Sequence, residues 1–303
     1  MGEKMKSTKE TLSKLKKDKN AIIIAHNYQL PEVQEIADFV GDSLELSKIA
    51  KKSGASIIVF AGVRFMAETA KILSPDKKIL LPVKDAGCPM ADQISSDDVR
   101  KLREEYPDAA FVAYVNTNAK VKSVVDICCT SSNAIKIVNS LKQKRVVFLP
   151  DKNLANWVSL HTKKEIIPYD GFCYVHNRFN KYEVLRMKEK YPDAEILIHP
   201  ESPPEVLKEA DFVLSTSGIL KRAAESDKKR FIIGTESGLI YRLNKENPEK
   251  DFYSLGEPKL CFNMKKTSLK DIYNSLFNER YEIFISESII NSARNSLERM
   301  VNI

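Results

Sequence analysis

Three cysteines recur at regular spacing along the chain. They are Cys88, Cys173 and Cys261, separated by 173−88 = 85 and 261−173 = 88 residues. Taken singly, a free cysteine is most often a small buried hydrophobic residue. Three cysteines at one repeated position instead predict thiolates that converge, and thiolates are soft ligands for zinc or for an iron–sulfur cluster.

A four-iron cluster on three cysteines would keep one iron free of protein ligands, and that iron could act on a substrate as a Lewis acid. The other two cysteines, Cys128 and Cys129, lie off the repeated position in an apolar segment, and we predict them in the core. The odd total of five cysteines argues against a disulfide framework.

Groups able to transfer protons lie at the ends of predicted strands or beside a cysteine. These groups are His26, Tyr28, His176, His199 and Glu201. A histidine at a strand end can be a hydrogen-bonded structural residue, but the convergence of several such groups favours catalysis. The fourth histidine, His161, has no such context, and we predict it on the surface.

Three hydroxyl residues stand where helices are predicted to begin. Ser43, Ser131 and Thr216 are separated by 131−43 = 88 and 216−131 = 85 residues. Each can be a helix N-cap, and the same helix terminus carries partial positive charge for a phosphate or carboxylate. Lys221, in the helix after Thr216, is either a surface charge, a phosphate ligand or a group for imine chemistry.

Ser43, Ser131 and Thr216 each end one of three partly similar copies of a segment. The copies occupy residues 22–43, 111–131 and 196–216. One position in the copies holds His26, Tyr114 and His199, at intervals of 114−26 = 88 and 199−114 = 85 residues. Self-similarity at a fixed period indicates repeated supersecondary units.

Strands alternate with helical segments throughout each copy. The third predicted strands are residues 57–61, 146–149 and 231–233, and the fourth are 79–83, 165–168 and 252–255. This alternation indicates βαβ units with parallel sheets, whose ligands bind beyond the carboxyl ends of the strands. We therefore predict an α/β fold of three αβα-sandwich modules. Each has a four-stranded parallel sheet, and the three surround a pseudo-threefold axis with a central active site.

The predicted modules meet near the repeated cysteines. They cover residues 1–87, 88–172 and 173–264. The tail, residues 265–303, starts like a fourth copy with a helix and a strand at Glu282–Ile285. We expect this tail to pack back on the first module.

Composition excludes several classes of function. The 303 residues are 43% hydrophobic and 29% charged, as in ordinary globular proteins, and no apolar run approaches the roughly 20 residues of a membrane helix. The net charge of +7 comes from scattered lysines, which indicates a solvated surface rather than a nucleic-acid site and is compatible with small anionic substrates. The first segment is too polar for a signal peptide, so we predict a cytoplasmic protein. The sequence contains no G-x-G-x-x-G or P-loop pattern, so it does not predict a nucleotide cofactor.

Several motifs resemble those of the A-type quinolinate synthase family, from about Ala21 to about Lys266. They read AHNYQ, ADFVGDS, GVRFMAE, CPMA, CTSSNA, PDKNL, HPE, GTE and CFNMKK. The resemblance implies a triplicated αβα fold with a 4Fe-4S cluster on Cys88, Cys173 and Cys261. It also implies that iminosuccinate condenses with dihydroxyacetone phosphate to quinolinate, releasing phosphate and water, in NAD biosynthesis. A partner that oxidises L-aspartate would supply the imine.

The same resemblance implies roles for individual residues. The expected catalytic residues are His26, Tyr28, Tyr114, His199 and Glu201. The expected substrate contacts are His26, Ser43, Tyr114, Val115, Asn116, Ser131, His199, Pro200, Glu201, Thr216 and Lys221. Two departures from the family pattern are mild: Tyr174 replaces a proline that often follows the second cysteine, and Ser202 stands where many members have a further cysteine.

Two other functions fit part of this pattern. An aconitase-like hydro-lyase would use the same open iron on a single carboxylate substrate. A binding protein would instead use the three cysteines to hold a structural zinc. Metal analysis and a substrate assay separate these alternatives.

Overall fold

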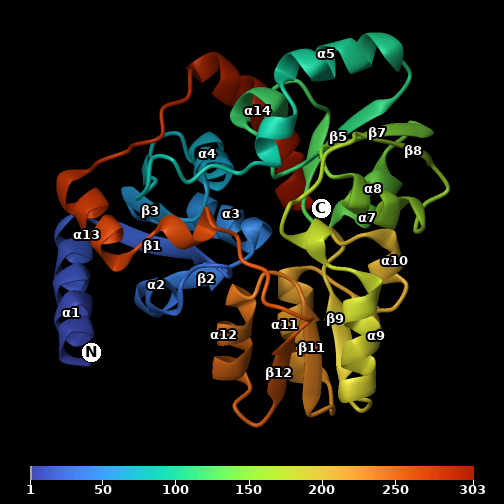
Figure 1. Cartoon of the computed structure of the whole chain (residues 1–303). Helices are drawn as coiled ribbons and strands as arrows, with labels where there is room; N and C mark the ends of the chain where they lie inside the picture. Colours follow the sequence, from blue (N-terminus) through green and yellow to red (C-terminus); the bar gives the residue numbers. More distant parts are fainter. Residues whose placement is uncertain (1) are drawn as a thin grey trace.

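Three parallel sheets form the framework in Figure 1, a computed structural model that describes residues 2–303. Each sheet has four strands, in the orders β2-β1-β3-β4, β6-β5-β7-β8 and β10-β9-β11-β12. All pairings within these sheets are parallel. The predicted fold of three repeated αβα modules is confirmed.

The strands follow the predicted positions to within a few residues. The first sheet contains β1 (Ala21–His26), β2 (Phe39–Gly41), β3 (Ile57–Ala61) and β4 (Lys78–Leu80). The second contains β5 (Ala110–Tyr114), β6 (Ile127–Cys129), β7 (Arg145–Leu149) and β8 (Glu165–Pro168). The third contains β9 (Glu195–Ile198), β10 (Phe212–Val213), β11 (Arg230–Gly234) and β12 (Asp251–Ser254). The central strands are almost entirely buried, because helices cover both faces of a parallel sheet.

Helices connect and cover these strands. In the first module they are α1 (Gly2–Asp18), α2 (Pro31–Ile36), α3 (Ser43–Lys52) and α4 (Arg64–Leu73). The second has α5 (Ser96–Glu105), α6 (Ala119–Lys122), α7 (Ala134–Ser140) and α8 (Lys152–Ser159). The third has α9 (Lys181–Lys190), α10 (Pro204–Leu207), α11 (Thr216–Glu225) and α12 (Gly238–Glu246), and the tail has α13 (Leu269–Asn278) and α14 (Glu287–Asn302). Short 3₁₀ turns, Ala91–Gln93, His176–Arg178 and Met264–Lys266, each begin three residues after a repeated cysteine.

The same kind of N-terminal cap recurs at the repeat interval in three helices. Capping boxes begin α5, α9 and α13 at Ser95, Asn180 and Ser268. These residues are 180−95 = 85 and 268−180 = 88 positions apart. A capping box satisfies two amides that a helix terminus would otherwise leave unpaired. The tail therefore begins with a true copy of the helix that opens the second and third modules.

The predicted tail strand at Glu282–Ile285 is wrong. Only one antiparallel bridge, between Leu80 and Glu282, forms there. Glu279 and Tyr281 adopt left-handed backbone conformations with φ of 52° and 63°, which turn the chain sharply before this segment. The segment therefore touches the edge of β4 briefly and then leaves it.

The two tail helices contact different parts of the molecule. Helix α13 packs against α1 and β3, whereas α14 packs against α4 on one side and against α6 and β6 on the other. The tail therefore also joins the first two sheets, as Figure 1 shows for the red α14. The module boundaries at residues 87, 172 and 264 stay a prediction, because sheets show where strands pair and not where one module ends.

Candidate active site

A central cavity lies where the carboxyl ends of strands from all three sheets meet. Its lining includes His26 at the end of β1, Tyr114 at the end of β5 and His199 directly after β9. The space between these side chains, together with its opening to solvent, is about 740 Å³. The three repeated strand ends thus form one site.

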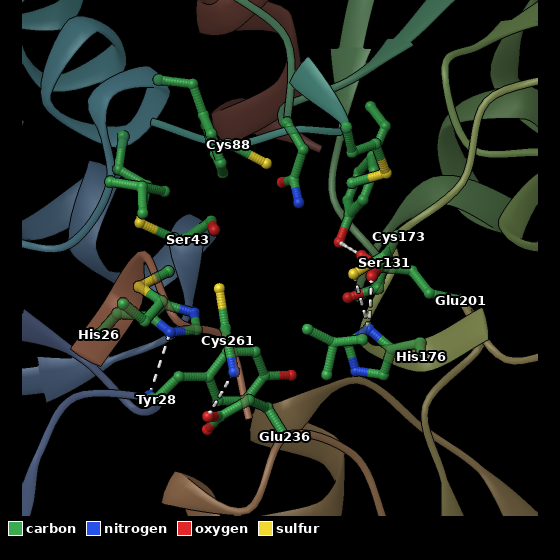
Figure 2. A pocket seen from close by; sticks show the side chains of 18 of the residues that line it. His26, Tyr28, Ser43, Cys88, Ser131, Cys173, His176, Glu201, Glu236 and Cys261 are labelled. Carbon is green, nitrogen blue, oxygen red and sulfur yellow. Dashed lines mark hydrogen bonds and ion pairs between the residues drawn. The ribbon is translucent and has the colours of Figure 1, made fainter. Parts of the chain in front are cut away.

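The three repeated cysteines project into this cavity from the loops that follow β4, β8 and β12, one strand of each sheet (Figure 2). Burial raises the pKa of the Cys88 thiol to about 12 and also raises the pKa values of Cys173 and Cys261. A bound metal reverses that effect, because its charge favours the thiolate. Three thiols gathered in one cavity, without a competing disulfide, therefore fit a metal centre.

The other two cysteines lie in the core, as predicted. Cys128 and Cys129 are fully buried in β6, and the Cys128 thiol lies 3.5 Å from the Ser296 hydroxyl on α14. They pack between the second sheet and the tail. They do not line the central cavity.

A second set of metal-ligand atoms adjoins the cysteines. Cys173, His176 and Glu201 each offer one ligand atom, and these atoms lie within 4.8 Å of one another. Glu201 and His176 are almost fully buried. Acid–base groups therefore stand directly beside one of the predicted metal ligands.

A continuous hydrogen-bonded chain joins these acid–base groups. The Tyr28 hydroxyl lies 2.6 Å from Thr235 Oγ1, which lies 2.9 Å from His176 Nε2. The other ring nitrogen, His176 Nδ1, lies 2.7 Å from Glu201 Oε2. The Tyr114 hydroxyl donates to the second oxygen of Glu201. The chain thus runs from the first module through the third to the second.

Within this hydrogen-bonded chain, one group is a base and two groups are acids. Burial of Glu201 opposes its ionisation, but its contact with His176 and the Tyr114 hydrogen bond outweigh this and lower its pKa to about 2. Burial raises the pKa values of Tyr28 and Tyr114 well above the ordinary phenol value, and the Glu201 charge adds to the rise. At neutral pH the site therefore holds a carboxylate between two phenols that keep their protons.

The two strand-end histidines are neutral hydrogen-bond donors. Burial lowers the pKa of His26 to about 4 and that of His199 to about 3. His26 Nδ1 accepts the Tyr28 backbone N–H at 3.2 Å, and His199 Nδ1 accepts the Glu201 backbone N–H at 3.4 Å. The proton of each neutral ring therefore resides on Nε2. In His199 this nitrogen lies 3.2 Å from the Ser131 hydroxyl.

The N-cap prediction for the three repeated hydroxyls is wrong. Asp42 caps α3 and Ser215 caps α11, while Asn133 occupies the cap position of α7. Ser43 and Thr216 are instead the first residues of their helices. Ser43 and Thr216 directly follow their caps, and Ser131 stands two residues before Asn133. All three nevertheless line the cavity.

Three of the expected substrate contacts, all within the described residues, lie outside the cavity lining. Val115 is buried in the core directly after β5, and Pro200 is buried between two lining residues. The Lys221 side chain is 73% exposed and lies 3.9 Å from Glu225 on the outer face of α11. Helix α11 therefore directs Lys221 to solvent. His161 is exposed, as predicted.

Several residues of the site were not predicted from the sequence. Thr235 completes the hydrogen-bonded chain, and Glu236 and Asp42 line the cavity. The motif GTE contains both Thr235 and Glu236. The repeat also marks Glu236, because Asp151 precedes it by 236−151 = 85 residues.

Comparison with known proteins shows the family of this chain. The family described as quinolinate synthetase A protein matches residues 10–302. The chain belongs to this family. A quinolinate synthase of Alkaliphilus metalliredigens is 52% identical over 97% of both chains. Quinolinate synthase 2 of Methanosarcina acetivorans is 50% identical over 97% of this chain and 95% of its own length.

A third relative covers almost the whole chain. A quinolinate synthase of Aquifex aeolicus is 50% identical over 99% of this chain and 95% of its own length. The resemblance of the short motifs to the quinolinate synthetase A family is thus confirmed over nearly the whole chain. None of the helices within residues 2–303 is long and apolar enough to cross a membrane.

Proposed function

We propose that this member of the family is a quinolinate synthase of NAD biosynthesis. It condenses iminosuccinate with dihydroxyacetone phosphate to quinolinate, releasing phosphate and water. One observation carries the proposal: three thiols, each following the last strand of a different sheet, line the same cavity as a buried acid–base chain. Relatives that bear this name, about 50% identical over the full length, support it.

We further propose that Cys88, Cys173 and Cys261 hold a 4Fe-4S cluster with one iron free of protein ligands. When bound, such a cluster supplies a Lewis acid that polarises a substrate oxygen. These three thiols line the cavity and the other two are buried in the core, which supports this ligand set.

Residues around the cavity suit two small anions. Ser43 and Thr216 begin α3 and α11, whose N-terminal amides carry partial positive charge. The neutral rings of His26 and His199 present Nε2–H donors toward the same space. Hydroxyls, amides and imidazole donors can therefore hold carboxylates and a phosphate.

The hydrogen-bonded chain suits the dehydration steps. Loss of water needs an acid that protonates the leaving hydroxyl and a base that takes a proton from carbon. Tyr28 and Tyr114 keep their protons and serve as acids, while ionised Glu201 serves as the base. Thr235 and His176 connect Tyr28 to Glu201, so a proton given by the phenol can be replaced along the chain.

A substrate assay tests this function. Anaerobic protein with reconstituted iron and sulfide should convert iminosuccinate and dihydroxyacetone phosphate to a pyridine dicarboxylate. Absence of that product, or hydration and dehydration of one carboxylate substrate alone, would favour the hydro-lyase. Stoichiometric zinc in a colourless protein would favour the binding protein.

The unstable imine suggests a supplier. We propose that an enzyme that oxidises L-aspartate delivers it, in the cytoplasm, where five free cysteines remain reduced. Adding such an enzyme with L-aspartate should replace added iminosuccinate in the assay. Failure of this coupled assay, with the direct assay working, would exclude that source.

A further inference from the structure

Two buried carboxylates occupy one repeated position behind the predicted cysteine ligands. Asp151 and Glu236 are both fully buried, and each stands two residues after the third strand of its module, β7 or β11. The equivalent position in the first module is Val63, since 236−151 = 85 and 151−63 = 88. Two modules therefore carry an acid where the first carries an apolar residue.

In the second module the carboxylate joins a helix start to the cysteine. Asp151 Oδ1 accepts the Leu154 backbone N–H at 2.7 Å and so caps α8. Its other oxygen, Oδ2, accepts the backbone N–H of Cys173 at 3.1 Å. Burial and then the nearby Glu201 charge raise the pKa of Asp151 well above its ordinary value, and these N–H donors offset that rise only in part.

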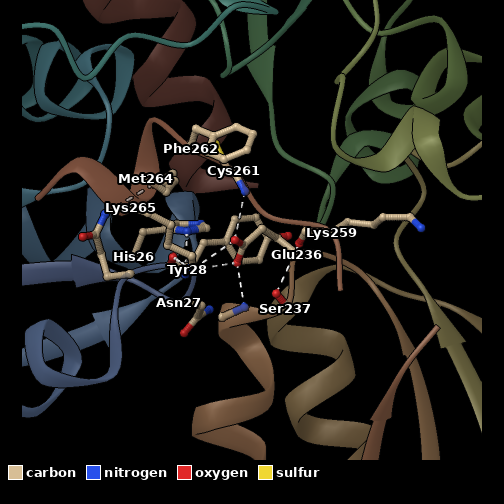
Figure 3. A network of polar contacts seen from close by, with 12 residues as sticks. His26, Asn27, Tyr28, Glu236, Ser237, Lys259, Cys261, Phe262, Met264 and Lys265 are labelled. Atoms are coloured by element: carbon tan, nitrogen blue, oxygen red, sulfur yellow. Dashed lines mark hydrogen bonds and ion pairs between the residues drawn. The ribbon is translucent and has the colours of Figure 1, made fainter. Parts of the chain in front are cut away.

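In the third module the arrangement is the same, although the acid is longer by one methylene. Glu236 Oε2 accepts the Gly238 backbone N–H at 2.7 Å at the start of α12, and Oε1 accepts the Cys261 backbone N–H at 3.0 Å (Figure 3). Lys265 Nζ lies 3.0 Å from the same carboxylate and also donates to the Tyr28 carbonyl. The Cys261 loop is thereby tied to the first module.

The first module has no carboxylate at this position, and helix α4 begins without a side-chain cap at Val63. The Arg64 N–H donates to the Ala86 carbonyl at 2.8 Å, and the equivalent bonds in the other two modules run from Lys152 to Gly171 at 2.8 Å and from Ser237 to Lys259 at 3.0 Å. These backbone bonds are common to all three cysteine loops. The carboxylates of Asp151 and Glu236 therefore add an anchor that Val63 cannot supply.

We propose that Asp151 and Glu236 are positioning residues that fix Cys173 and Cys261 for the metal centre, an inference that rests on the proposed function. A buried carboxyl oxygen that accepts a backbone N–H satisfies both groups, and a departing loop would leave both partners unsatisfied. Metal ligands also need support from the groups behind them, whose loss weakens metal binding about 10- to 100-fold. Each carboxylate therefore presents its thiol to the cavity before a cluster arrives.

Cluster stability tests the proposal. Asp151→Asn and Glu236→Gln keep the side-chain shape but place an NH₂ group against one backbone N–H. The rate at which an anaerobic iron chelator removes the cluster should rise about tenfold in each. The control is Asp211→Asn, which alters an acid that also accepts a backbone N–H, from Ile196 at 2.8 Å, and lies outside the cavity lining. Rates equal to the control would overturn the proposal.

Alkylation of the thiols in cluster-free protein gives a second readout. Asp151→Asn should speed labelling of Cys173 alone, and Glu236→Gln should speed labelling of Cys261 alone, each by about tenfold relative to Cys88. Buried Cys128 and Cys129 report loss of the fold. Equal acceleration at all five cysteines would overturn the proposal, because it would assign the carboxylates to general stability.

The two proposals fail in different ways. If the wild-type protein takes up no cluster, the proposed function fails, while the site-selective labelling still decides whether the carboxylates position the thiols. If the wild-type protein holds a cluster and the variants behave like Asp211→Asn, only the positioning role fails.

Discussion

At the scale of single residues, burial sets the protonation of the site. His26 and His199 are 5% and 3% exposed, and their rings stay neutral because desolvation penalises the imidazolium. Each ring fixes its proton on Nε2 by accepting a backbone N–H at Nδ1. Both histidines are therefore donors to substrate rather than cationic ligands.

This neutrality makes stability depend on pH. Unfolded His26 titrates at its ordinary pKa of 6.5, whereas the folded ring stays neutral down to about pH 4. Between these values the unfolded state binds more protons, so the free energy of unfolding falls as the pH is lowered from 6.5 toward 4. Thermal melts of cluster-free protein across this window should show the decline, and His26→Gln should reduce its slope. An unchanged slope in His26→Gln would show that His26 does not contribute to the decline in stability.

Thr235 is the residue on which proton transfer along the chain depends. Thr235→Val keeps the volume but removes the hydroxyl between Tyr28 and His176. We expect kcat to fall about 100-fold, as for loss of one acid–base contact, with little change in KM. The control is Thr267→Val, since Thr267 is a buried threonine whose hydroxyl has no hydrogen-bond partner within the described residues. Equal kcat values for the two variants would contradict a relay through Thr235.

At the scale of elements, helix α14 joins two modules. Its buried face includes Ala293, Leu297 and Met300, and Ser296 donates to the Lys122 carbonyl at 2.9 Å. Asn133, at the start of α7, donates to the Met300 carbonyl at 3.0 Å. The helix is thus part of the shared core and not a loose extension.

Shortening one side chain on α14 tests this role. Leu297 is fully buried, and Leu297→Ala should lower the free energy of unfolding by about 2–5 kcal/mol, through lost burial and the cavity left behind. Asn295→Ala, on the exposed face of the same helix, should change it by less than about 0.5 kcal/mol. Denaturant titrations measure both. Similar values for the two variants would show that α14 contributes little to the core.

At the scale of the whole molecule, one hydrophobic core runs through all three modules. Ile24, Val112 and Ile233, from the three different sheets, belong to one buried cluster. The central cavity lies at the same junction, with one repeated cysteine after the last strand of each sheet. A centre held by these thiols would therefore cross-link residues that are far apart in the chain.

Binding of the proposed iron–sulfur cluster should stabilise the folded protein. A ligand that binds only the folded state adds about 4 kcal/mol at a thousandfold excess over its Kd, so anaerobic reconstitution should raise Tm. Cys88→Ala, Cys173→Ala and Cys261→Ala should each abolish both the cluster absorbance and this increase. Cys128→Ala should retain both, from a lower starting Tm. An unchanged increase in any of the first three would remove that cysteine from the ligand set.

The sequence alone determined the parts of this protein that are local and repeated. The apolar segments located the strands, because burial of a strand depends on its own residues. The intervals of 85 and 88 residues located the three cysteines and the strand-end histidines. The same intervals led to a three-module fold with a central site.

Only the tertiary structure decided what depends on contacts between modules. It joined Tyr28, Thr235, His176 and Glu201 into one chain, turned Lys221 to solvent and placed α14 between two modules. The direction of a side chain and its hydrogen-bond partner depend on how elements distant in sequence pack together. No local pattern of residues carries that information.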